Sequence, residues 1–173
     1  MTNWILTVLI VMPFCSATAQ SRDAIVGTWR LVSITNTTAK GEVNYPMGRN
    51  PSGFITYTAD GRMMVIITGD GRKALSVSDY IAAPTEERAE AFATLAAYAG
   101  RYTLTGDRVI HHVEIAWMQN LVNTDLIRSV VKLDSNNLIL RTPSGAPSIL
   151  RGGVEVASQE AVWERVKPDT SSR

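Results

Sequence analysis

The chain has 173 residues, with 17 Lys and Arg against 16 Asp and Glu, two His and one Cys. A net charge of +1 argues against a nucleic-acid binder or an anionic-membrane binder, and a single cysteine excludes a disulfide scaffold. With 45% hydrophobic and 19% charged residues, the chain has the composition of one folded domain with an ordinary core rather than of a disordered protein.

The N-terminal residues have the pattern of an export leader. Residues 5–14 form an apolar run, and Ala17-Thr18-Ala19 gives the small-x-small pattern that signal peptidases cleave. The run is shorter than the roughly 20 apolar residues of a membrane span, although no Lys or Arg precedes it. We expect residues 1–19 to be a cleaved leader and the mature protein to be periplasmic or secreted, with no membrane span. An uncleaved membrane anchor is the alternative.

Residues 23–166 read as one domain of short strands, and residues 167–173 form a polar tail expected to be disordered. Asp60-Gly61 is typical of a tight hairpin turn, because it supplies the positive φ that such turns need. Sequential hairpins favour an all-β, antiparallel up-and-down β-barrel, since closure removes exposed edges. The expected strands are residues 28–36, 53–58, 62–68, 101–105, 109–118, 125–133, 138–142 and 154–165.

One helix is expected to interrupt the strands. Thr85 can cap it, Glu86 and Glu87 suit the positive end of its dipole, and Gly100 can end it. We expect this helix to pack on the barrel wall or to lie across one mouth as a lid. Its apolar face has helical spacing and comprises Ala91, Phe92, Leu95, Ala96 and Ala99.

Several blocks of the sequence form a recognisable pattern when taken in order. These blocks are Gly27-Thr28-Trp29, Tyr45–Gly48, Gly53–Met63, Tyr98–Tyr102, His111–Glu114 and Asn123–Arg128. Together they resemble the lipocalin-like domain family. The resemblance implies a small-molecule-binding barrel in which Trp29 closes the base and Arg165, on the last strand, packs over it, and a cation–π contact of this kind contributes about 0.5–2 kcal/mol. Residues 121–124 depart from the family pattern, so the barrel mouth is expected to differ there.

Alternation along the strands decides which side chains can share the lumen. In the first strand it places Trp29 and Leu31 on one face and Ile34 on the other. His111 and His112 cannot both point inward, so a metal site built from them is poor and we expect no metal.

His112 and Glu114 share a face, and a neutral imidazole beside a carboxylate is a workable acid–base pair. If their face lines the lumen, the pair meets a ligand. If the opposite face lines it, the face that carries His111 and Val113, the pair lies on the outer wall. The sequence leaves this choice open.

Other candidate contacts lie on neighbouring strands. Arg128 suits a carboxylate or phenolate held inside an apolar barrel, or else it is a surface charge paired with Glu114. Tyrosines suit an apolar pocket that needs a hydroxyl, and either Met63 or Met64 must point inward. Trp29 and Trp163 are expected to be structural. The expected ligand contacts are Tyr57, Met64, Tyr102, His112, Glu114 and Arg128.

These observations predict an exported barrel that binds a small hydrophobic molecule in its lumen. No dinucleotide-binding loop, phosphate loop or nucleophile elbow occurs, so we expect no cofactor. The alternative is a cofactor-free isomerase, cyclase or hydratase that uses His112 and Glu114. A third hypothesis is a solid barrel that acts through its outer surface. The sequence does not indicate an oligomeric state or decide whether the chain is an enzyme.

Overall fold

The computed structural model of the chain describes residues 22–144 and 156–167. The expected leader, the first residues of the last expected strand and most of the expected tail lie outside the described residues. Within the described ranges, no helix is both long enough and apolar enough to cross a membrane.

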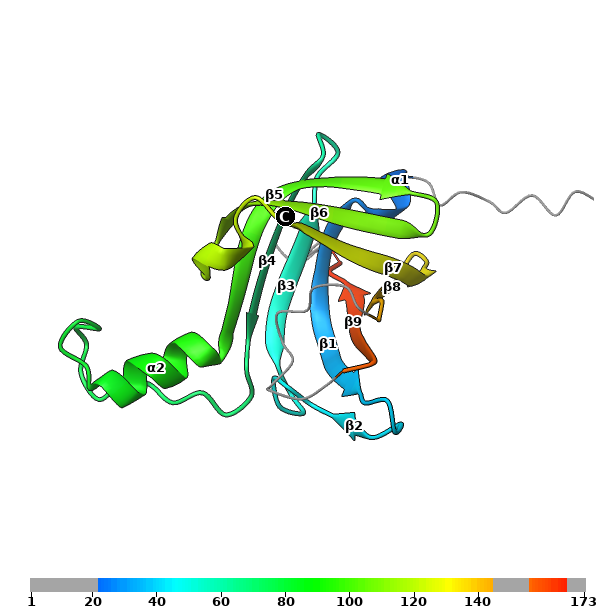
Figure 1. Cartoon of the computed structure of the whole chain (residues 1–173). Coiled ribbons are helices and arrows are strands. Elements are labelled where there is room, and N and C mark those ends of the chain that lie inside the picture. The colour runs from blue at the N-terminus through cyan, green and yellow to red at the C-terminus, as the bar shows by residue number, and fades with distance from the viewer. Residues whose placement is uncertain (1–21, 145–155, 168–173) are drawn as a thin grey trace, which may run out of the picture.

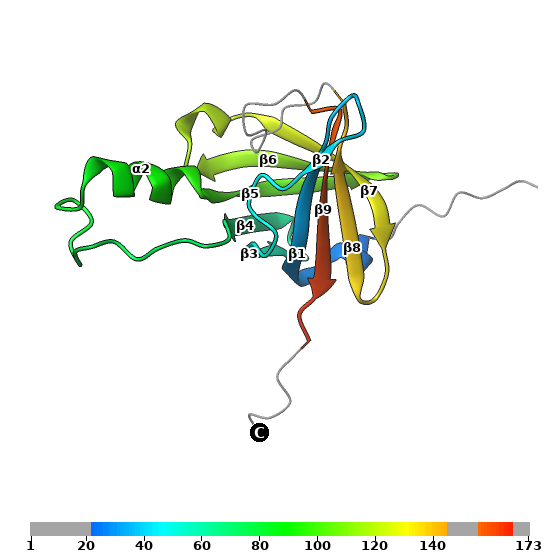
Figure 2. The ribbon, with the colours of Figure 1, turned by 90° about the horizontal axis from the view of Figure 1, so that it is seen from below.

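The described residues form nine antiparallel strands in a single sheet, in the order β2-β1-β3-β4-β5-β6-β7-β8-β9. Pairing of β1 with β9 closes eight of them into a barrel, and β2 extends one end of β1 (Figures 1 and 2). The expected up-and-down barrel is confirmed. The strands are β1 (Gly27–Thr37), β2 (Val43–Asn44), β3 (Ser52–Tyr57), β4 (Arg62–Thr68), β5 (Leu95–Thr105), β6 (Arg108–Ala116), β7 (Asp125–Leu133), β8 (Asn137–Thr142) and β9 (Ser158–Arg165).

Short turns join the strands at one end of the barrel. Gly61 has a φ of 90° and donates its backbone N–H to the carbonyl of Thr58, as the Asp60-Gly61 pair predicts. In the β7–β8 turn, Asp134 accepts backbone hydrogen bonds from Asn136 and Asn137, which lower the pKa of its carboxyl to about 2. The turn chemistry of the sequence therefore sets the hairpin register directly.

The same end is closed by the short helix α1 (Arg22–Ile25) and by Trp29. The Trp29 Nε1–H donates to the carbonyl of Ile25 at 2.9 Å, and the Arg165 guanidinium lies 3.9 Å above the Trp29 ring. Arg165 also donates to the Ala24 and Val26 carbonyls at 2.6 and 2.8 Å. A Cβ on Gly27 would approach Arg165 Nη1 to 2.6 Å, which explains the glycine two residues before Trp29. The expected contact of Arg165 with Trp29 is confirmed.

A bulge in β1 changes which side chains face inward. The register against β9 shifts between Leu31 and Ser33, so Val32 is exposed while both Leu31 and Ile34 are buried. The expectation that Ile34 lies opposite Leu31 is wrong, because the extra residue of the bulge resets the alternation.

The expected helix is shorter than predicted. Helix α2 (Thr85–Ala93) ends before Leu95, where β5 begins, and Pro84 rather than Thr85 occupies its N-cap position. Residues 95–100 pair with β4 and β6, so tertiary pairing overrides the helix propensity of this alanine-rich segment. Gly100 does not end a helix. It lies at a bulge where an added Cβ would approach the His112 carbonyl oxygen to 1.9 Å.

Helix α2 also lies elsewhere than expected. It buries none of its residues, and it projects from the barrel instead of packing along the wall or closing a mouth (Figures 1 and 2). Its main contact with a strand is with the start of β5. Helix α2 therefore contributes no buried residue to the continuous apolar core, which includes Trp29, Leu31, Ile55 and Trp163.

Candidate functional site

The structure divides the six expected ligand contacts into two groups. Tyr57, Tyr102 and Arg128 point into the barrel and are at most 7% exposed. The other three lie on the outer wall. Met63 and Met64 alternate on β4, and it is Met63 that is buried, while Met64 is 57% exposed.

On β6 the mainly apolar face turns inward and carries Val109, His111 and Val113. His112 and Glu114 therefore face outward. The expectation that Met64, His112 and Glu114 line the lumen is wrong for this reason, because the core selects the more apolar of two alternating faces.

His111 is the polar exception on the inward face of β6, and two tyrosines satisfy its ring. The Tyr57 hydroxyl lies 2.8 Å from His111 Nε2, and the Tyr98 hydroxyl lies 2.9 Å from His111 Nδ1. Burial, together with the positive charge of Arg128, holds the pKa of His111 well below its ordinary value of 6.5. The imidazole is thus neutral, with one donor and one acceptor nitrogen. One tyrosine donates to the ring and the other accepts from it, and the tautomer of His111 decides which does which.

Arg128 is a buried cation without a buried anion beside it. Its side chain is 7% exposed, and its Nη1 donates to the Ile127 carbonyl at 2.9 Å. Among the described residues, none of the ion pairs includes Arg128. Burial raises the pKa of Tyr98, while the neighbouring Arg128 opposes that rise through its charge and a hydrogen bond. An uncompensated buried charge is costly, so this guanidinium is a strong attractor for an anionic group.

A cavity of about 40 Å³ lies beside this cluster, in the interior of the barrel. All eight barrel strands contribute to its lining, which is apolar except for the side chains of Tyr98, His111, Arg128 and Gln159 and the indole N–H of Trp163. Trp163 Nε1 is buried and meets no hydrogen-bond acceptor in the described part of the chain. Most buried polar atoms in proteins have a partner, so this donor marks the cavity as a place where an acceptor belongs.

The polar part of the cavity lining consists mainly of hydrogen-bond donors. Arg128 and Trp163 offer only donors, and the Tyr98 hydroxyl can add another when His111 Nδ1–H donates to it. The cavity has room for roughly three water molecules or one small polar group, since a water needs about 10–15 Å³ of such space. It is far smaller than the roughly 300–1,000 Å³ of a pocket for a drug-sized ligand. The arrangement thus suits the acceptor end of a ligand rather than a large apolar body.

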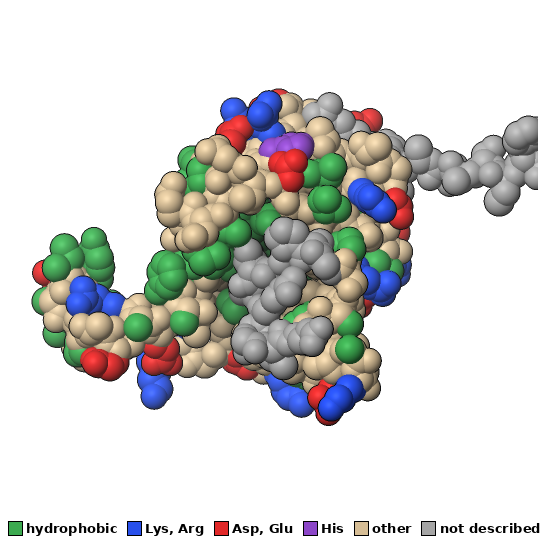
Figure 3. Space-filling model, in the orientation of Figure 1, with side chains coloured by type: hydrophobic (Ala, Val, Ile, Leu, Met, Phe, Trp, Pro, Cys, Tyr) green, Lys and Arg blue, Asp and Glu red, His purple; other side chains and the backbone are tan. Residues whose placement is uncertain are grey.

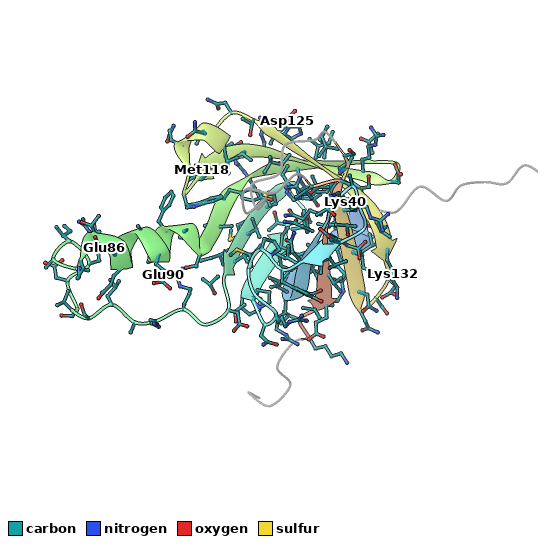
Figure 4. All side chains as sticks on the ribbon, turned by 60° about the horizontal axis from the view of Figure 1, so that its bottom comes forward. Lys40, Glu86, Glu90, Met118, Asp125 and Lys132 are labelled. Atoms are coloured by element: carbon teal, nitrogen blue, oxygen red, sulfur yellow. The ribbon has the colours of Figure 1, made fainter. Side chains whose placement is uncertain are left out.

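The outer wall carries a separate polar cluster. Glu114 forms ion pairs with Arg62 and Arg101, whose hydrogen bonds lower the pKa of its carboxyl. His112 instead bonds Asp125 through Nδ1 at 2.7 Å and Thr103 through Nε2 at 3.0 Å. Figure 4 shows Asp125 at the outside of the barrel.

The expected acid–base pair of His112 with Glu114 is not formed, because each side chain is engaged by other partners. The suggested surface pairing of Arg128 with Glu114 is excluded too, because Arg128 points inward.

Sequence reasoning missed part of the cavity. The ligand contacts expected from the sequence do not include Tyr98, His111 or Trp163, although all three line the cavity. Hairpin register carried the missing signal, because Tyr102 pairs directly with His111 across β5 and β6, which places Tyr98 and His111 on the same inner face.

Comparison with models of protein families agrees with the fold. The family model described as "Lipocalin-like domain" matches residues 26–166. Among solved structures, a lipocalin-like protein from Bacteroides uniformis has a TM-score of 0.42 and 14% identity, over 83% of this chain and 99% of its own. An uncharacterized protein from Bacteroides eggerthii has a TM-score of 0.44 and 11% identity, over 82% of this chain and 99% of its own. The search of curated proteins gave no match.

Proposed function

Since the chain belongs to the lipocalin-like domain family, we propose that it binds a small organic anion in the barrel lumen, with the anionic group at Arg128 and a compact apolar remainder. The observation that carries this proposal is a buried guanidinium at Arg128 that forms no ion pair within the described residues, together with the buried indole N–H of Trp163 that has no hydrogen-bond partner there. A carboxylate accepts from a planar guanidinium in a bidentate manner and still has lone pairs for a third donor.

The walls of the cavity define the rest of the ligand. Ile34, Ile67 and Leu140 supply apolar surface next to the charged end, and burial of an apolar ligand surface contributes about 25 cal/mol per Å². The cavity has room for little more than the anionic group. Any apolar remainder therefore requires packed side chains to shift, at a cost of about 1–3 kcal/mol that favours a short or single-ring remainder over a longer one. The preferred class is therefore a small aromatic or short aliphatic carboxylic acid.

The test compares ligands that differ only at the polar end. Isothermal titration calorimetry with benzoate and hexanoate, against benzyl alcohol and hexanol, is expected to give binding of the acids and much weaker binding of the alcohols. Arg128→Met is expected to weaken acid binding at least tenfold, whereas Arg108→Met, on the outer wall of β6, leaves it unchanged. Equal binding of acids and alcohols, or of acids to both variants, contradicts the anionic assignment. No binding of any of the four contradicts the luminal function for this class of ligand.

We also propose that residues 1–19 are cleaved and that the mature barrel is exported. The apolar run and the Ala17-Thr18-Ala19 pattern support this proposal. Intact mass of the protein recovered from the cell envelope and from the medium tests it. A mass that matches a chain beginning at Gln20 agrees with the proposal, and a mass that still includes residue 1 contradicts it.

A further inference from the structure

The connection between β4 and β5 projects away from the barrel. This arm, defined here as residues 70–94, runs outward and returns through α2 (Figures 1 and 4). Its outgoing limb is tied to the helix, since Arg72 donates to the Ala91 and Thr94 carbonyls and Ser76 donates to the Glu87 carboxylate at 2.9 and 3.1 Å. The arm is thus preorganised as a projecting element.

The arm exposes large apolar side chains, of which Phe92 also contacts the ring of Trp117. Val77, Tyr80, Ile81 and Phe92 are between 42% and 68% exposed, and hydrophobic side chains are visible on the arm in Figure 3. An isolated helix of nine residues is marginal in water, and α2 buries none of its residues against its own barrel. Apart from the ring contact of Phe92 with Trp117, helix α2 therefore lacks the packing that normally stabilises such a helix.

A second unpartnered apolar surface lies on the outer wall of the same chain. This outer patch, defined as Phe54, Met64, Ile66 and Ile115, is between 47% and 70% exposed. Strand register makes it continuous, because Phe54 pairs with Ile66, and Met64 and Ile115 both pair with Ala99. The small side chains of β5 between them leave the patch open to a neighbouring surface.

We propose that the arm of one copy packs on the outer patch of a second copy, and that the reciprocal contact completes a twofold-symmetric dimer. An interface in which the same two surfaces meet twice closes on itself and forms no filament. A half-exposed large apolar side chain contributes on the order of 100 Å². The eight side chains of arm and patch, counted on both copies, then cover on the order of 1,600 Å², which is the size of a standard stable interface.

Charge favours a second copy over a membrane. Helix α2 carries three Glu and one Arg, which opposes binding to an anionic lipid surface. The patch is bordered by Arg30, Arg62 and Arg101, all with exposed side chains, against Glu114 and Glu164. The acidic helix and the basic border of the patch are complementary.

Sedimentation velocity of the full chain over a concentration series tests the proposal. The wild type is expected to be a dimer, and Ile81→Glu on the arm and Met64→Glu on the patch are each expected to raise the dimer dissociation constant at least tenfold. Val131→Glu, at an exposed position of β7 outside the patch, is the matched control and is expected to leave the dimer intact. Unchanged circular dichroism melting curves verify that all three variants fold.

Mixing the two variants tests the pairing of arm with patch. A heterodimer of the Ile81→Glu and Met64→Glu chains has one wholly intact contact, formed by the arm of the second chain on the patch of the first, and is expected to form more tightly than either variant alone. A wild-type monomer at all concentrations overturns the proposal, and so does a dimer that both variants leave unchanged. Recovery of monomer that binds phosphatidylcholine vesicles through Ile81 overturns it in favour of a membrane surface. If the mixed variants associate no more tightly than either variant alone, the proposed contact of arm with patch is overturned.

Discussion

Replacement of Arg128 by methionine is expected to stabilise the ligand-free barrel while it removes the proposed anion affinity. Arg128 is 7% exposed, and its guanidinium donates hydrogen bonds to the Ile127 carbonyl and to the Tyr98 hydroxyl. Replacing buried charge by an apolar side chain of similar length often stabilises a protein by about 1–4 kcal/mol, and loss of the two hydrogen bonds offsets about 2 kcal/mol. The net expectation is a gain of about 1–2 kcal/mol in the free energy of unfolding.

Urea unfolding and thermal melting measure this gain. For a domain of this size, the melting temperature is expected to rise by roughly 2–10 °C. Arg108→Met, exposed on β6, is expected to change stability by less than about 0.5 kcal/mol. Saturating benzoate is expected to raise the melting temperature of the wild type but not of Arg128→Met, because only a bound ligand stabilises the folded state. A loss of stability in ligand-free Arg128→Met would refute the reasoning, since Arg128 would then be a structural hydrogen-bonding residue.

Three further predictions concern the residues that frame the cavity. Burial lowers the pKa of His111 from its ordinary value of 6.5, so the unfolded state binds a proton before the folded state does. The contribution of His111 to stability is therefore complete above about pH 6.5, and it decreases at lower pH by up to about 1.4 kcal/mol per pH unit. Urea unfolding between pH 4 and 8 is expected to show this slope in the wild type and a smaller slope in His111→Gln. Gly100→Ala is expected to lower the free energy of unfolding by about 3 kcal/mol or more, because the new Cβ meets the His112 carbonyl. Gly106→Ala has open space around its new Cβ and is expected to cost about 1 kcal/mol, because Gly106 has a positive φ. Equal losses of stability for the two variants in chemical denaturation would contradict the close approach at Gly100. Arg165→Met is expected to lower the free energy of unfolding by about 2–4 kcal/mol, because it removes the cation–π contact and the hydrogen bonds to backbone carbonyls. Arg30→Met, at an exposed arginine, is expected to lower it by less than about 1 kcal/mol. A similar melting temperature for the two variants would argue against a role of Arg165 in closing the base of the barrel.

The boundary between α2 and β5 shows the limit of local patterns. Leu95, Ala96 and Ala99 have helical spacing, but the same segment also alternates, and Ala96, Tyr98 and Gly100 are buried in turn along β5. Alanine and leucine favour a helix in isolation. Pairing with β4 and β6 supplies hydrogen bonds on both sides, so the strand forms although its residues are not typical strand formers.

Bulges limited the assignment of faces. The extra residue near Val32 turned Ile34 inward, and the register shift opposite Gly100 exposed both Glu114 and Ile115 on consecutive positions. A period of two cannot indicate a bulge, because the bulge depends on how the partner strand curves.

The sequence by itself determined the barrel, its hairpin turns and its closed base, because turn chemistry, alternation and the contact of Trp29 with Arg165 are encoded by residues whose local preferences agree with the final fold. It also determined that His111 and His112 lie on opposite faces, since the strand period allows nothing else. Only the tertiary structure decided which of the two faces inward. Tyr57 and Tyr98 come from two other strands, and closure of the barrel brings both hydroxyls to the ring of His111, so the inner place goes to the histidine whose hydrogen bonds can be satisfied without water.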